Sequence, residues 1–212
     1  MLDKIKDLYA VQVRGDAWMN KLMFHVKHPI FILTMTVPFI LAVSYYALFV
    51  ADYSVVFFAS IFVLGAVTWN LLEYCIHRFV FHDLVKFLRK VPAPWDKVID
   101  GFHPAHHRDP NDKFLVLAPP FGAFVVTVVL YWISFLFTRD YLVSGVFMSG
   151  LSSAYLFYEW IHYGSHFFKF RAFPIGRYYK RYHLYHHFKR PKEAYGVTGP
   201  VWDHVFKTSK SQ

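Results

Sequence analysis

Ten of the thirteen histidines in this sequence fall into four short groups with regular spacing. Two groups have the pattern H-x-x-H-H, and each of the other two holds a pair of histidines four or five residues apart. The groups are His103, His106 and His107; His183, His186 and His187; His77 and His82; and His162 and His166. On a helix, positions i, i+3 and i+4 lie within an arc of about 100°. Each H-x-x-H-H group therefore predicts a helix that aims three imidazoles at one point.

Clustered imidazoles predict a transition-metal site. Neutral imidazole binds zinc, iron, copper and nickel, whereas carboxylate and carbonyl oxygens suit magnesium and calcium. Because a structural zinc ion takes about four ligands, ten converging histidines are too many for one ion. We therefore expect two metal ions with roughly five histidine ligands each. Scattered surface or core histidines would not account for two copies of one spacing.

The composition favours a membrane protein. The chain is 56% hydrophobic and only 17% charged, whereas soluble domains have roughly 25% charged residues. The net charge of +9 could indicate nucleic-acid binding. However, the positive residues flank apolar segments and form no nucleic-acid motif, so we expect no nucleic-acid partner. The single cysteine, Cys75, excludes an intrachain disulfide and a cysteine-based metal site.

Four apolar segments are long enough to cross a hydrocarbon core of about 30 Å. They predict an all-α integral membrane protein with four transmembrane helices in two hairpins, at about 29–50, 54–75, 116–137 and 143–162. Residues 1–28 contain no secretory signal and are expected to form an amphipathic segment at the membrane interface. Residues 29–212 are expected to form a single membrane-embedded domain.

The distribution of positive charge predicts the orientation. Five Lys and Arg residues precede the first span, seven lie between Arg78 and Lys113, and ten lie from Lys169 onward. The two hairpin turns contain only Arg139. By the positive-inside rule, both termini and all four histidine groups are cytoplasmic. The membrane would be a bacterial inner membrane or the endoplasmic reticulum.

Two glutamates lie on the same helix faces as the histidines. Glu73 precedes His77 by one turn, and Glu159 precedes His162 in the same way. Carboxylates within a membrane are costly and usually functional. We expect Glu73 and Glu159 to accept the N–H groups of ligand histidines and so orient the rings, although a helix–helix hydrogen bond is the alternative.

One pair of histidines does not fit a regular helix. His77 and His82 would lie about 140° apart around its axis. We therefore expect the helix to end or distort between them.

Four kinds of protein can have a histidine-rich site in a membrane protein, and these features favour the first of them. A di-iron oxygenase would act on a lipid at the membrane surface, where cytoplasmic reductant is available. A metal transporter would place its ligands near the middle of the membrane, whereas these lie at the ends of the spans and in the loops. A zinc-dependent lipid hydrolase would need about three protein ligands, fewer than are present. A purely structural metal domain would not explain charged residues within the spans.

The order and spacing of the motifs resemble the fatty acid hydroxylase superfamily, and most closely its fatty acid 2-hydroxylase branch. The resemblance covers the chain from about residue 65 onward. It includes the four histidine groups, and the segments Tyr195-Gly196-Val197-Thr198 and Trp202-Asp203-His204-Val205-Phe206.

The resemblance implies a dimetal centre in a cytosolic helical cap and O₂-dependent hydroxylation at C2 of a fatty acid or ceramide acyl group. It also implies that the ten grouped histidines are metal ligands. Two iron ions are the expected cofactor, and purified protein can carry zinc because imidazole sites often bind zinc at least as tightly as Fe²⁺. Tyr155 and Tyr158 are expected to line the path of the acyl chain. Carotenoid ring hydroxylases and sterol desaturases or methyl oxidases share the histidine groups and remain alternatives.

Many members of this superfamily carry a cytochrome b5 domain with a His-Pro-Gly-Gly haem motif. This sequence contains no such motif. We therefore expect a separate ferredoxin, cytochrome b5 or reductase to supply the electrons.

The predicted orientation can be tested by cysteine labelling. We expect Ser54→Cys and Asp140→Cys to react with an impermeant thiol reagent from the non-cytoplasmic side, and Ser209→Cys to react only after permeabilisation. The physical reason is that almost all Lys and Arg residues lie outside the two hairpin turns. The parent chain, with Cys75 as its single cysteine, is the control. Labelling of both turns and the tail from the same side would contradict four spans.

Overall fold

The computed structural model describes residues 30–88, 103–117 and 120–209. Every regular element within these ranges is a helix, which confirms the all-α fold class. The expected interfacial segment, residues 1–28, lies outside the described residues. The chain divides into two compact units.

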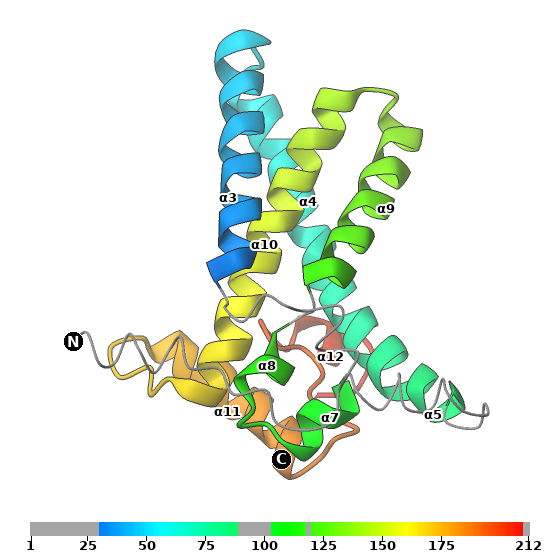
Figure 1. The fold of residues 1–212 in the computed structure, drawn as a ribbon, viewed down its shortest axis with the longest axis vertical. Coiled ribbons are helices and arrows are strands. Elements are labelled where there is room, and N and C mark those ends of the chain that lie inside the picture. Colours follow the sequence, from blue (N-terminus) through cyan, green and yellow to red (C-terminus); the bar gives the residue numbers. More distant parts are fainter. Residues whose placement is uncertain (1–29, 89–102, 118–119, 210–212) are drawn as a thin grey trace. The chain divides into compact units, whose positions relative to one another are not determined.

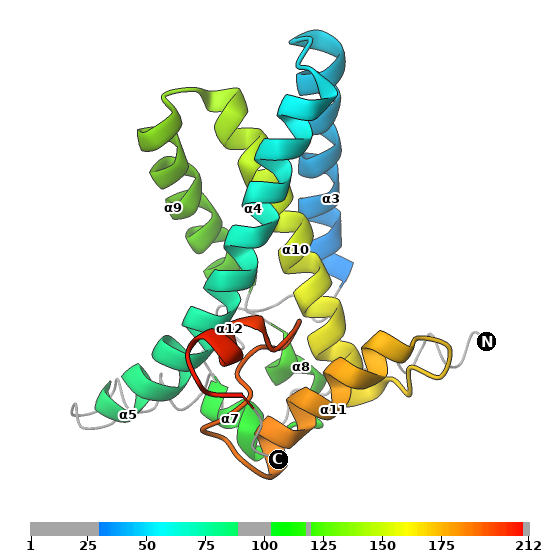
Figure 2. The same cartoon turned by 180° about the vertical axis from the view of Figure 1, so that it is seen from behind.

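The first unit contains the apolar helices. They are α3 (Ile30–Tyr45) with its π-helical extension η1 (Tyr46–Val50), most of α4 (Val55–Cys75), α9 (Pro120–Thr138) and the first part of α10 (Tyr141–Phe167) (Figures 1 and 2). These helices lie within a few residues of the four expected segments, and the crossing of a membrane by all four stays a prediction. Within the described residues, two helical stretches are long and apolar enough to cross a membrane, Ile32–Val50 and Val55–Phe87, and Ala123–Thr138 is a shorter apolar helix. Many of the large apolar side chains on these helices are exposed, among them Phe49 and Val56.

Two glycines let α4 and α10 approach at the level of the main chain. A Cβ atom on Gly65 would lie 2.0 Å from the carbonyl oxygen of Phe147, and one on Gly150 would lie 1.8 Å from that of Phe62. Neither position can accept a side chain unless the helices move apart. Small residues at such contacts are typical of helices that associate in membranes, because close backbone approach increases van der Waals contact.

The second unit contains the histidine groups. Here α4 continues into a second π-helix, η2 (Ile76–Leu84), and then α5 (Val85–Leu88). The short helices α7 (His103–Arg108) and α8 (Lys113–Val116) follow, then the end of α10, α11 (Pro174–Phe188) and α12 (Val201–Val205). Pro174 suits the start of α11, where the first N–H groups have no partner within the helix.

The close contact at Gly150 predicts that adding a single methyl group there destabilises the protein. We expect Gly150→Ala to lower the free energy of unfolding by about 1–3 kcal/mol, because the added Cβ meets backbone that cannot rotate away. Thermal unfolding of the detergent-solubilised protein would measure the loss. Gly145→Ala is the matched control on the same helix, since its Cβ would meet only the side chain of Val43, at 3.3 Å. Equal stability of the two variants would contradict the packing described here.

Candidate metal centre

The ten grouped histidines form two clusters of five. The first cluster is His77, His82, His103, His107 and His186, and the second cluster is His106, His162, His166, His183 and His187. Within each cluster, the five potential ligand nitrogens all lie within 4.8 Å of one another. This is the division into two groups of five that the number of histidines predicted.

The π-helix η2 brings His77 and His82 into the same cluster. Its backbone hydrogen bonds join residues i and i+5. Residues five positions apart therefore lie closer to the same face of the helix than they would on a regular α-helix. The centres of the two imidazole rings are 5.1 Å apart. The distortion predicted between these residues is therefore confirmed, and it takes the form of a widened helix.

The three histidines of each H-x-x-H-H group are divided between the two clusters. The prediction that all three rings of a group point at one metal site is therefore wrong. His103 and His107 belong to the first cluster, but His106 belongs to the second. On α11 the division is reversed, with His183 and His187 in the second cluster and His186 in the first. The reason is geometric, because adjacent helical residues differ by about 100° in direction and diverge, whereas i and i+4 share a face.

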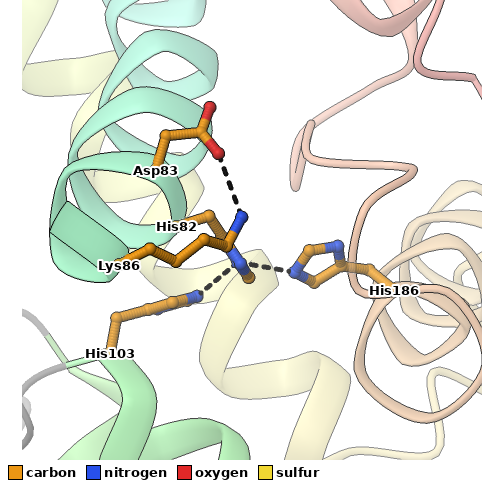
Figure 3. A network of polar contacts seen from close by, with 5 residues as sticks. All are labelled: His82, Asp83, Lys86, His103 and His186. Atoms are coloured by element: carbon orange, nitrogen blue, oxygen red, sulfur yellow. Dashed lines mark hydrogen bonds and ion pairs between the residues drawn. The ribbon is translucent and has the colours of Figure 1, made fainter. Parts of the chain in front are cut away.

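The ring nitrogens converge at distances that suit metal ligands. In the first cluster, His82 Nε2 lies 3.1 Å from both His103 Nε2 and His186 Nε2 (Figure 3). In the second, His106 Nε2 lies 3.1 Å from His187 Nε2 and 3.2 Å from His162 Nε2. Two ligands at right angles, each about 2.1 Å from one ion, would be separated by about 3.0 Å. A neutral imidazole has a single N–H, so five convergent rings cannot all satisfy one another, and a cation fits this donor set.

Burial keeps the rings neutral and therefore able to bind a metal. Removal from water lowers the pKa of His186 and of His166 to about 4, and that of His107 to about 3. Burial also lowers the pKa values of His106 and His183 well below the usual range, with neighbouring rings adding to the effect. At neutral pH each of these imidazoles has a lone pair available for coordination.

The two clusters are immediate neighbours. The ring of His107, in the first cluster, stacks on the ring of His187, in the second, with a centroid distance of 4.2 Å. His106 and His107, like His186 and His187, are consecutive residues that serve different clusters. The two clusters therefore form one continuous group of imidazoles.

Main-chain carbonyls orient two imidazole rings of the first cluster by accepting hydrogen bonds from their Nδ1 atoms. His186 Nδ1 lies 2.8 Å from the carbonyl oxygen of Glu193, and His77 Nδ1 makes a short contact with that of Tyr195. A carbonyl oxygen can only accept a hydrogen bond, so Nδ1 donates in both rings. Each Nε2 then presents its lone pair to the cluster, as metal coordination requires.

Glu73 has a different environment from the one we expected. Its carboxylate accepts hydrogen bonds from the backbone N–H groups of Val197 and Thr198, at 2.7 and 2.8 Å, and from the Thr198 hydroxyl. These contacts replace the predicted bond to a ligand histidine, because the segment after α11 folds back against the end of α4. Glu73 therefore holds Val197 and Thr198, which follow Tyr195 in the same segment.

The remaining predicted residues lie on α10. Glu159 is buried one turn before His162. Tyr158 stacks on the ring of His162 with a centroid distance of 5.5 Å, and Tyr155 packs edge-on against Trp69. Their roles in orienting ligands and lining an acyl path stay predictions. Sequence reasoning missed Tyr195 and Asp203 as individual contributors, although both lie in the C-terminal motifs that carried the resemblance.

The sequence and the fold place this chain in a known family. The sequence profile described as fatty acid hydroxylase matches residues 62–208, and the chain belongs to that family. The solved structure of full-length scs7p, in which only the hydroxylase domain is visible, superposes with a TM-score of 0.75 at 27% identity, covering 86% of this chain and 66% of that one.

The curated relatives below are named as hydroxylases of fatty acids or of ceramide acyl groups, two of them as 2-hydroxylases. The dihydroceramide fatty acyl 2-hydroxylase FAH2 of Arabidopsis thaliana is 32% identical over 68% of this chain and 58% of its own length. The fatty acid 2-hydroxylase of Rattus norvegicus is 34% identical over 77% of this chain and 44% of its own length. The ceramide very long chain fatty acid hydroxylase scs7 of Schizosaccharomyces pombe is 36% identical over 70% of this chain and 42% of its own length. The matched region thus spans about half the length of these relatives.

The division into clusters predicts how single substitutions change metal content. We expect His186→Ala and His187→Ala each to reduce the bound metal from two ions per chain to about one, because the two residues serve different clusters and neither is shared. Elemental analysis of purified protein would measure this. His204→Ala is the control, because His204 is exposed and belongs to neither cluster. Retention of both ions in His186→Ala would contradict the assignment.

Proposed function

We propose that this protein hydroxylates a lipid acyl chain with O₂, at C2 of a fatty acid or of the acyl group of a ceramide. The observation that carries the proposal is the pair of adjacent five-histidine clusters, in a chain whose relatives are named as 2-hydroxylases. The ten histidines of the two clusters are the proposed ligands, and two iron ions are the proposed cofactor.

Iron suits the proposed reaction better than zinc does. An iron pair would supply the redox chemistry that activates O₂, whereas zinc has no redox chemistry of its own. Imidazole sites nevertheless bind zinc at least as tightly as ferrous iron, so purified protein can carry zinc without being a hydrolase. Electrons would come from a separate ferredoxin, cytochrome b5 or reductase.

The proposed role of the protein is to hold the ligands and to position the acyl chain. Burial keeps the imidazoles neutral, and the carbonyls of Glu193 and Tyr195 direct two lone pairs into the first cluster. Tyr158, stacked on His162, is a candidate wall for the acyl chain. A buried site also excludes water, which protects reactive species from side reactions.

The position of hydroxylation follows from where the site would lie at the membrane. We propose four transmembrane helices with both termini and the histidines on the cytoplasmic side, as the positive charges predict. C2 is bonded directly to the carboxyl carbon, so it lies beside the headgroup. A site just outside the bilayer could then reach C2 without drawing the whole tail from the membrane.

Isotope tracing tests the proposal. Expression with a co-expressed electron donor under ¹⁸O₂ should raise labelled 2-hydroxy acyl lipids, measured by mass spectrometry, because the hydroxyl oxygen would come from O₂. His186→Ala should abolish the product, whereas His204→Ala should retain it.

Other labelling patterns would separate the alternatives. Label on a carotenoid ring or a sterol would exclude the 2-hydroxylase branch and leave the oxygenase class intact. A hydroxyl oxygen derived from water would contradict the oxygenase class itself. Metal accumulation by cells without any hydroxylated product would favour transport.

A further inference from the structure

The segment that orients the first cluster has no regular secondary structure of its own. It runs from Glu193 to Thr198, between α11 and α12, and carries the two carbonyls that accept from His186 and His77. Backbone outside helices and strands needs other partners for its N–H groups, since an unpaired buried N–H is costly. The partners of this segment therefore decide where its carbonyls point.

Two buried carboxylates accept four consecutive backbone N–H groups of this segment. Asp203 accepts from Tyr195 at 2.9 Å and from Gly196 at 2.8 Å, and Glu73 accepts from Val197 and Thr198. Asp203 is fully buried and Glu73 is 3% exposed. Asp203 also accepts from the Thr208 hydroxyl at 2.8 Å, which ties it to the end of the described chain.

One peptide group connects Asp203 directly to a histidine of the first cluster. The amide between Tyr195 and Gly196 donates its N–H to Asp203 Oδ2, and its carbonyl oxygen accepts from His77 Nδ1. A carboxylate on the N–H side polarises the amide and makes its carbonyl a stronger acceptor. This chain of contacts has the same effect as a carboxylate bonded directly to a ligand histidine, with a peptide group inserted between them.

The second cluster lacks this arrangement within the described residues. The buried Nδ1 atoms of His106, His162, His183 and His187 make no hydrogen bond to the part of the chain that the structure describes. The carbonyls of Glu193 and Tyr195 contact His186 and His77, both in the first cluster.

We propose that Asp203 and Glu73 are positioning residues for the first metal site, acting through the backbone of residues 193–198 on His77 and His186. The inference rests on the proposed two-metal centre and goes beyond it, because it makes the two sites unequal. Loss of either carboxylate would loosen the ligands of one ion and leave the other ion in place.

Cobalt titration of the full chain in detergent provides the test. Co²⁺ is added to chelator-treated protein, and its visible absorption reports both affinity and ligand geometry. We expect Asp203→Asn to weaken one of the two bound ions about 10–100-fold, the usual effect of losing a group that orients a ligand histidine. The affected absorption band should be the one lost in His103→Ala, and the band lost in His183→Ala should be unchanged.

Glu73→Gln is the second variant and should produce the same selective loss, which keeps the test decisive if Asp203→Asn does not fold. Asp140→Asn is the matched control, because Asp140 also accepts two backbone N–H groups, from Leu142 and Val143, but has no connection to a cluster. Both ions should bind this control as they bind the parent chain.

The outcomes separate this inference from the proposed function. Weakening of both ions to the same extent would indicate a general structural defect and overturn the inference, as would unchanged binding in both variants. A parent chain that binds fewer than two Co²⁺ ions would refute the two-metal function itself, and this inference with it.

Discussion

Ten imidazoles gathered in a buried space are the constraint on which the site depends. Each ring has one N–H and one lone pair, and burial keeps the rings neutral, as the lowered pKa values of His186 and His166 show. Neutral rings avoid the repulsion that ten cations would produce, but their converging lone pairs still need a common partner. A metal ion in each cluster is the partner that this geometry suits, and the surrounding helices serve to bring the rings together.

Each of the two helices that carry an H-x-x-H-H group contributes histidines to both clusters. α7 contributes two rings to the first cluster and one to the second, and α11 does the reverse. Any movement of one helix would therefore disturb both clusters at once. This coupling, together with the stacking of His107 on His187, favours two ions that work as one centre.

The C-terminal segment has a role that its composition does not suggest. It lacks regular structure around Tyr195, yet two buried carboxylates hold its backbone and its carbonyls face histidines. Buried carboxylates are costly unless several donors satisfy them, and here backbone N–H groups supply most of those donors. Asp203 shows the balance, because burial raises the pKa of its carboxyl group while hydrogen bonds from Gly196, Thr208 and Tyr195 lower it.

The sequence by itself determined the elements and the chemistry of this protein. Apolar length predicted the helices, the number of histidines predicted two groups of five, and the spacing of His77 and His82 required a distorted helix, because all three depend on local periodicity or composition. Only the tertiary structure decided which histidine serves which cluster, and that Glu73 holds residues 197 and 198 rather than a ligand ring. These choices depend on contacts between residues far apart in the sequence, for example 21 positions for His82 and His103 and 125 for Glu73 and Thr198. No local pattern specifies which distant N–H group a buried carboxylate will meet.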